Sequence, residues 1–81
     1  MEDLLSSYRV GIFTFRLNRE SNTYSARGSE VIDDYGDKWP EPAVMDAAEK
    51  LTNMLAERGY EVDWSTSEKG WVDVWVKGKK D

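Results

Sequence analysis

The side chains best suited to chemistry in this sequence are three carboxylates near its C-terminal end, Glu61, Asp63 and Asp73. Glu61 and Asp63 are two residues apart, a spacing that places both on one face of a strand. Paired carboxylates are the acid and base of glycosidases, but such a site needs a groove and a raised pKa on one partner. A chain of 81 residues offers little groove. We therefore predict that these acids form the solvated face of a strand and have no catalytic role.

A second group of acids, Asp33, Asp34, Asp37 and Glu41, lies in the middle of the chain. Oxygen ligands of this kind suit calcium. However, the ligand spacing of an EF-hand, with its central glycine and terminal glutamate, is absent. The segment is therefore predicted to be a solvated loop that holds no metal.

The amino-acid composition excludes most other kinds of active site. The chain has no cysteine and no histidine, so it has no thiolate nucleophile, no zinc–thiolate site and no imidazole base. A Ser-His-Asp set, a phosphate-binding glycine loop and a nucleotide fingerprint are also missing from the sequence. We expect a protein that is not an enzyme and that uses no cofactor.

Phe13 and Phe15, together with Arg16 and Arg27, faintly resemble the sheet surface of RNA-recognition domains. The glycine-aromatic core motif of those domains is missing. The simpler interpretation is that the phenylalanines are core residues beneath a helix.

The segment Gly59–Gly78 predicts the elements that would position these residues. Tyr60–Ser67 and Trp71–Lys77 are rich in β-branched and aromatic residues, as strands are. Glu68–Gly70 separates them as a three-residue turn, in which Gly70 is expected to adopt the left-handed conformation. This turn would pair Ser67 with Trp71, Trp64 with Val74 and Val62 with Val76.

Alternation along these two strands gives them unlike faces. One is apolar and faces the core: Val62, Trp64, Val72, Val74 and Val76. The other mixes Trp71 and Trp75 with Asp63 and Asp73. The opposite assignment, with the tryptophans inward, would bury carboxylates without partners, which is costly. We therefore expect Trp71 and Trp75 on an open face, with Val10 and Ile12 of a neighbouring strand extending an apolar patch.

The remaining segments predict two further strands and one helix. Tyr8–Leu17 is apolar on both faces and is expected to be a central strand, whereas Thr23–Val31 is more polar and is expected at an edge. Asp33–Glu41 is predicted to be a loop. The helix is expected over Pro42–Arg58, with Pro42 at its first position and Gly59 ending it. Its core face is Val44, Ala47, Ala48, Leu51, Met54 and Leu55.

The predicted fold class is therefore α+β, in the order β-β-α-β-β, as a single small domain over residues 1–81. One helix would cover one face of a four-stranded sheet with the strand order 2-1-4-3. Nothing else in the chain would cover the other face.

Charge and hydropathy suggest where the protein works. The net charge is −5, which disfavours nonspecific nucleic-acid binding. No apolar run is long enough to span a bilayer, and the acidic N-terminus is unlike a signal peptide. A cytoplasmic location without membrane contact is expected, consistent with the absence of cysteine.

The expected function is protein binding through the open sheet face and the acidic loop. Small acidic proteins of this composition fit accessory factors or inhibitors of the phage and mobile-element type, anti-CRISPR proteins among them. The partner would present a basic surface, a homodimer through the open face is the simplest case, and nucleic acid is not the expected partner. The alternative is binding of single-stranded nucleic acid or carbohydrate by the exposed tryptophans. The predicted partner-binding residues are Trp71, Trp75, Asp63, Asp73, Asp33, Asp34, Asp37 and Trp39.

Overall fold

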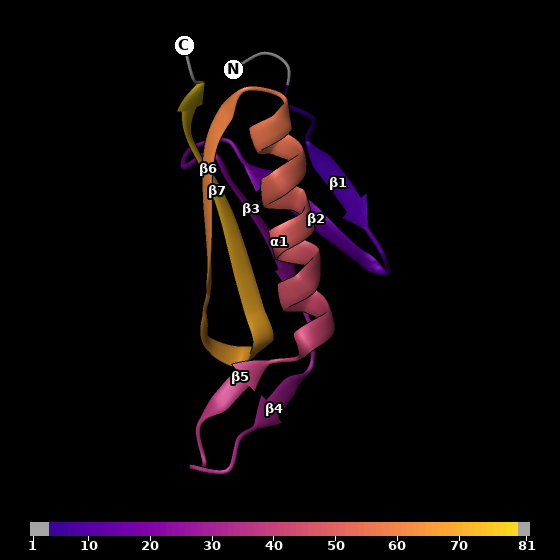
Figure 1. Cartoon of the computed structure of the whole chain (residues 1–81), viewed down its shortest axis with the longest axis vertical. Coiled ribbons are helices and arrows are strands. Elements are labelled where there is room, and N and C mark those ends of the chain that lie inside the picture. The colour runs from indigo at the N-terminus through magenta and orange to yellow at the C-terminus, as the bar shows by residue number, and fades with distance from the viewer. Residues whose placement is uncertain (1–3, 80–81) are drawn as a thin grey trace.

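The computed structural model describes residues 4–79, which form one α-helix, one short 3₁₀ turn and seven β-strands (Figure 1). The fold is thus α+β, as predicted. In chain order the elements are β1 (Ser7–Val10), β2 (Phe13–Asn18), β3 (Thr23–Arg27), β4 (Glu30–Ile32), β5 (Lys38–Pro40), α1 (Pro42–Glu57), β6 (Tyr60–Thr66), the 3₁₀ turn η1 (Glu68–Gly70) and β7 (Trp71–Lys79).

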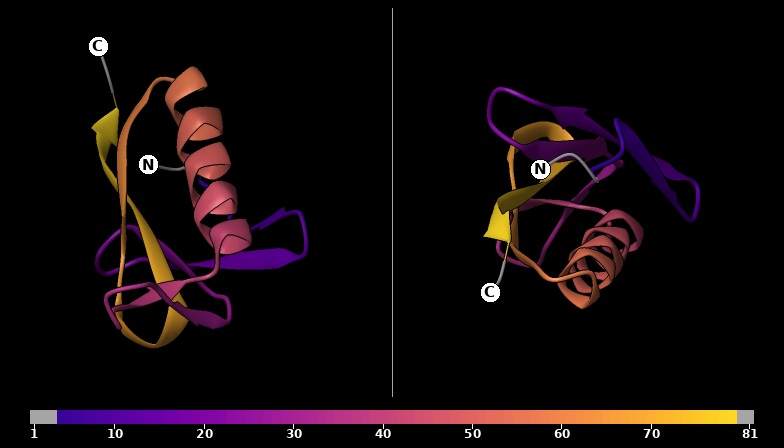
Figure 2. Two further views of the ribbon diagram at one scale, coloured as in Figure 1. Left: turned by 60° about the horizontal axis from the view of Figure 1, so that its bottom comes forward. Right: turned by 90° about the horizontal axis from the view of Figure 1, so that it is seen from above.

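Within the described residues, five strands form one antiparallel sheet in the order β1-β2-β3-β7-β6, and β4 pairs with β5 in a separate two-stranded sheet. The five-stranded sheet curls around one side of the helix, with β1 and β2 at one end of the curl and β6 and β7 at the other (Figure 2). Helix α1 packs against β1, β6 and β7. No element within residues 4–79 covers the opposite face of the sheet.

The helix confirms its prediction almost to the residue. Pro42 stands in its first turn, where the missing N–H is not needed, and Gly59 follows its end with φ of 93°. Its inward residues pack against aromatic and aliphatic side chains of the sheet. The most deeply buried members of this core are Phe15, Tyr24, Val44, Ala48, Leu51, Leu55, Val72 and Val74.

The C-terminal hairpin also has the predicted register. Val62 pairs with Val76 and Trp64 with Val74, and the Ser67 N–H donates to the Trp71 carbonyl at 2.8 Å. The turn differs in one respect from its prediction. Gly70 does have a positive φ, but Lys69 has one as well, at 61°.

The prediction of a single strand over Tyr8–Leu17 was wrong. The chain reverses at Gly11, whose φ is 63°, so that Tyr8 pairs with Phe15 and Val10 with Phe13. A left-handed glycine opens a tight turn that an extended strand would not contain. The apolar residues on both sides of this turn therefore belong to one face of a hairpin rather than to two faces of one strand.

The strand order and the loop prediction need correction as well. Thr23–Val31 is not an edge strand, because its first part, β3, lies between β2 and β7. After Gly28 the chain leaves the sheet, and the predicted loop Asp33–Glu41 contains β5, paired with β4. The polar residues of β3 face the open side of the sheet, so the polarity of this segment reflects an uncovered face and not the predicted edge position.

Candidate interaction surface

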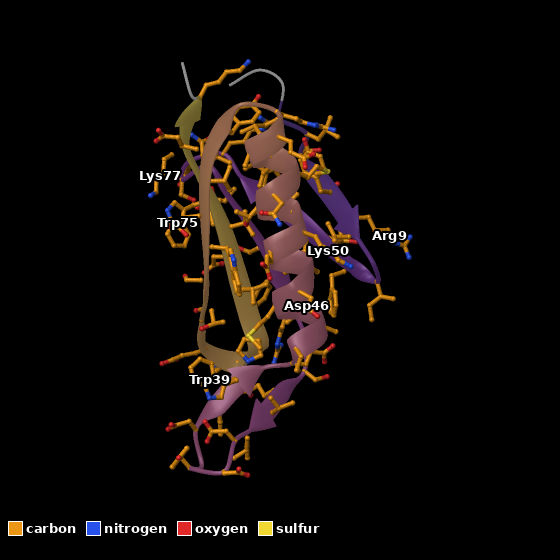
Figure 3. All side chains as sticks on the ribbon, viewed as in Figure 1. Arg9, Trp39, Asp46, Lys50, Trp75 and Lys77 are labelled. Atoms are coloured by element: carbon orange, nitrogen blue, oxygen red, sulfur yellow. The ribbon has the colours of Figure 1, made fainter. Side chains whose placement is uncertain are left out.

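The two tryptophans of β7 lie on the open side of the sheet. Val72, Val74 and Val76 are buried against the helix, whereas Trp71 is 41% exposed and Trp75 is half-buried. Figure 3 shows Trp75 pointing outward from the strand, next to Lys77. The predicted assignment of faces therefore holds.

The carboxylates of this face have partners within the sheet. Asp73 accepts a hydrogen bond from the Ser25 hydroxyl of β3 at 2.7 Å. Asp63 pairs with Lys77, with 3.6 Å between Oδ2 and Nζ. Both acids lie where the sequence predicted them, and both contribute to cross-strand contacts.

The open face is polar rather than apolar, contrary to expectation. Val10 pairs with Phe13, both partly buried against the core, and Ile12 lies in the β1–β2 turn with 80% of its surface exposed. Neither residue extends the tryptophan patch. Besides Asp63, Asp73 and Lys77, this face carries polar side chains from β2 and β3: Thr14, Arg16, Asn18, Thr23, Ser25 and Arg27.

The phenylalanines are core residues. Phe15 is fully buried and Phe13 packs against the core from a partly buried position. The RNA-binding arrangement considered for Phe13 and Phe15 therefore does not exist on this sheet.

The acidic segment forms the tip of the β4–β5 hairpin, and Asp33 organises it. Asp33 Oδ1 accepts the N–H groups of Tyr35 and Asp37 at 2.8 and 2.9 Å, and Oδ2 accepts the Trp39 indole N–H at 2.8 Å. These bonds, led by the one from Trp39, lower the pKa of the Asp33 carboxyl below its usual value. Asp33 is thus a structural residue of the turn, and the ionised carboxylate is the form that the turn stabilises.

Four of the seven large apolar side chains that are exposed among residues 4–79 lie on this same hairpin. Val31, Ile32 and Trp39 are 40%, 67% and 44% exposed, and Tyr35 at the tip is 92% exposed. The hairpin extends beyond the end of the helix and of the main sheet (Figure 1). It therefore presents Val31, Ile32 and Tyr35 to solvent, whereas Trp39 lines a groove between the hairpin and turn η1.

Two grooves meet at Arg27. One, of about 530 Å³, runs between the β4–β5 hairpin and turn η1 and is lined by Arg27, Lys38, Trp39 and Lys69, with Glu30 and Glu68 also on its walls. The other, of about 390 Å³, crosses β2, β3 and β7 on the open face, where Arg16 and Trp71 line it. The Arg27 Nε–H donates to the Lys69 carbonyl at 2.9 Å and so connects β3 to the turn.

The predicted site residues thus fall into two groups. Trp71, Trp75, Asp63 and Asp73 share the open face, while the second group belongs to the projecting hairpin: Asp33, Asp34, Asp37 and Trp39. The predicted site left out Arg16 and Arg27 of the open face, which the sequence suggested only together with Phe13 and Phe15, and it left out Ile32 and Tyr35 of the hairpin. Thr14, Arg16 and Asn18 alternate with buried residues, and this alternation indicates an open face. It can be recognised only when the turn at Gly11 is known, because the strand then begins at Phe13.

No group of three or more acidic, histidine or cysteine side chains within residues 4–79 is placed to hold a metal ion. In the same range there is no helix with the length and apolar character needed to cross a membrane.

Comparison of the chain with protein-family models, with curated proteins and with solved structures finds no match.

Proposed function

We propose that this chain is a non-enzymatic protein-binding module whose main contact element is the projecting β4–β5 hairpin. The observation that carries the proposal is the exposure of Val31, Ile32, Tyr35 and Trp39 on one small element that stands away from the core. Exposed aromatic and aliphatic clusters on small proteins mark contact sites, because leaving them in water is unfavourable. Tyrosine and tryptophan are also enriched among residues that dominate binding energy.

The hairpin also suggests the character of the partner. It carries the carboxylates of Glu30, Asp33, Asp34 and Asp37 against the single ammonium of Lys38. An apolar hairpin with an acidic tip complements an apolar recess with a basic rim. Such a module would act as an accessory factor or inhibitor by occupying that recess, and a protein of the anti-CRISPR type is one form that we propose for it. A cytoplasmic location, suggested by the absence of cysteine, is part of the same proposal.

The hairpin is held rigidly enough for this role. Asp33 fixes the tip through three hydrogen bonds. At the base, the Glu41 N–H donates to the Ser29 carbonyl at 2.7 Å and Glu41 Oε2 accepts the Ser29 N–H at 2.8 Å. A preorganised loop loses less conformational entropy on binding than a mobile one does.

Site-specific photocrosslinking in the native host tests the proposal. A photoreactive phenylalanine analogue replaces Tyr35 at the tip or, as the matched control, Glu49 on the exposed face of α1. We expect one discrete adduct from position 35, competed by the unlabelled chain and lost when Ile32→Ser is added. Adducts of equal strength from both positions, or an adduct that survives Ile32→Ser, would contradict the proposal. Circular dichroism of Ile32→Ser checks that the fold is retained.

A further inference from the structure

The groove across β2, β3 and β7 has a chemistry distinct from that of the rest of this acidic protein. Its polar and aromatic walls come from Thr14, Arg16, Asn18, Ser25, Arg27 and Trp71, and none of the described residues that line it is acidic. The chain as a whole carries a net charge of −5. Two guanidinium groups and an indole without a lining carboxylate therefore form a local site for a ligand that is anionic and has a flat ring.

The arginines hold this position because of the strand register. Arg16 lies opposite Ser25 and Arg27 lies opposite Trp71. Arg9 of β1, opposite Thr14, adds a third cation on the same side. Asp63 pairs with Lys77 between β6 and β7, away from the groove lining, whereas Asp73 borders the groove and accepts a hydrogen bond from the Ser25 hydroxyl of its wall. The two guanidinium groups of the lining thus outnumber the Asp73 carboxylate that borders it.

A second stacking surface lies farther along the same path. Arg27 lines both grooves, and the second groove contains Trp39 together with Lys38 and Lys69, although Glu30 and Glu68 border it too. The path from Trp71 across Arg27 to Trp39 therefore alternates indole rings with cations. Repeating negative charge with repeating flat rings is the chemistry of single-stranded nucleic acid.

We propose that this path binds a short stretch of single-stranded nucleic acid, with Trp71 stacking on a base and Arg16 and Arg27 contacting phosphates. The proposal does not rest on the proposed protein partner of the hairpin, although Trp39 belongs to both surfaces. A sheet-on-sheet homodimer is the competing use of this face. The polar character of Thr14, Asn18 and Ser25 disfavours it, since packed sheets bury apolar inner faces. A neutral carbohydrate would not need the guanidinium groups.

Fluorescence anisotropy with the full chain and a labelled ten-nucleotide oligo(dT) or oligo(U) tests the proposal, from 25 to 200 mM salt. We expect binding that weakens steeply with salt. Arg16→Gln should reduce the affinity about fivefold or more at 25 mM salt and lower the slope of log K against log salt by roughly 0.7, the value for one phosphate contact on a single strand. Trp71→Ala should weaken binding by about tenfold, the order expected for one lost stacking contact.

Matched controls isolate the groove. Lys50→Gln removes one positive charge from the exposed face of α1, and Trp75→Ala removes an indole from the open face outside the groove. Both variants should bind like the parent chain. Circular dichroism verifies that each variant is folded, and Arg16→Gln keeps the test valid if Trp71→Ala does not fold.

Three outcomes would overturn the proposal. The first is no binding at 25 mM salt. The second is equal loss of affinity in the groove variants and the control variants. The third is a concentration-dependent dimer in sedimentation velocity that Arg16→Gln disrupts, without oligonucleotide binding, because the open face would then be a self-interface.

Discussion

At the scale of single residues, two glycines allow β3, the C-terminal hairpin and the start of α1 to lie in close contact. Gly28 and Gly70 face each other, and the Gly28 N–H donates to the Gly70 carbonyl at 2.8 Å. A Cβ added at Gly70 would collide with the Gly28 carbonyl oxygen, and one added at Gly28 would lie 2.7 Å from Val44 Cγ1. The contact joins β3, the C-terminal hairpin and the start of α1, so neither glycine has room for a side chain.

Gly70→Ala should therefore destabilise the protein more than Gly59→Ala does. Both glycines have a positive φ, which costs alanine about 1 kcal/mol. A Cβ at Gly59 meets nothing within 4 Å, so that variant loses only this amount. Urea unfolding should show a loss for Gly70→Ala of at least about 2 kcal/mol, since backbone must shift as well. Equal unfolding midpoints for the two variants would show that the close contact is not rigid.

A buried phenol predicts how stability depends on alkaline pH. Tyr24 is fully buried, donates its hydroxyl to the Leu5 carbonyl, and lies edge-on to the Tyr8 ring. Burial raises the pKa of Tyr24 from 10.0 to about 12. The folded state therefore favours the neutral phenol, whose contribution is complete below pH 10 and is lost as the pH rises toward 12.

Tyr24→Phe should lower the free energy of unfolding by about 1 kcal/mol at pH 7, because phenylalanine cannot make the hydrogen bond to Leu5. Between pH 7 and pH 11 the variant should lose less stability than the parent chain, because it has no phenol at this position to ionise. Urea unfolding at the two pH values measures both effects. Tyr35→Phe is the control, because Tyr35 is 92% exposed and should behave like the parent chain. Identical pH dependence for Tyr24→Phe and the parent chain would refute the argument.

At the scale of elements, the helix and the C-terminal hairpin meet in the core. Leu51 and Val74 are both fully buried. Truncation should cost about 2–5 kcal/mol for Leu51→Ala and about 1–3 kcal/mol for Val74→Ala in urea unfolding. Lys50→Ala, one residue away on the exposed side of the helix, should stay within about 0.5 kcal/mol of the parent chain. Comparable losses at positions 50 and 51 would be inconsistent with the observed helix face.

The elements also show what local sequence can and cannot predict. The helix and the Trp64–Val74 register were predictable, because each depends on a short pattern bounded by a glycine. The turn at Gly11 was missed because apolar residues continue on both sides of it. Strand order was not predictable, since the β3–β7 pairing joins residues such as Ser25 and Asp73, 48 positions apart.

The candidate site was predictable to the same extent. Alternation along one strand was enough to place Trp71 on the open face. Arg16 and Arg27 line the same groove as Trp71 because β3 pairs with β7, and this pairing lies outside any local window of the sequence. Ile32 is exposed because it lies on the β4–β5 hairpin. The turn-forming residues of this segment predicted a loop in place of the hairpin.

At the scale of the whole molecule, β3 holds the main sheet together. Within residues 4–79, the β3–β7 ladder is the strand pairing that joins the N-terminal strands to the C-terminal hairpin, whereas β4 and β5 pair only with each other. The main sheet and helix should therefore unfold as one cooperative unit, with the β4–β5 hairpin as an appendage.

Proline substitutions at Ser25 and Ile32 distinguish the unit from the appendage. Ser25 lies between Arg16 and Asp73 in a central strand, where proline removes a ladder hydrogen bond and does not fit the strand. Ser25→Pro should lower the free energy of unfolding by about 3 kcal/mol or more, a large share of the total for a chain of this size. Ile32→Pro should shift it by less than about 1 kcal/mol, because Ile32 pairs only with Lys38 of the projecting hairpin. Urea titrations followed by both tryptophan fluorescence and circular dichroism measure this difference. If Ile32→Pro lowered the free energy of unfolding as much as Ser25→Pro, the hairpin would belong to the cooperative core.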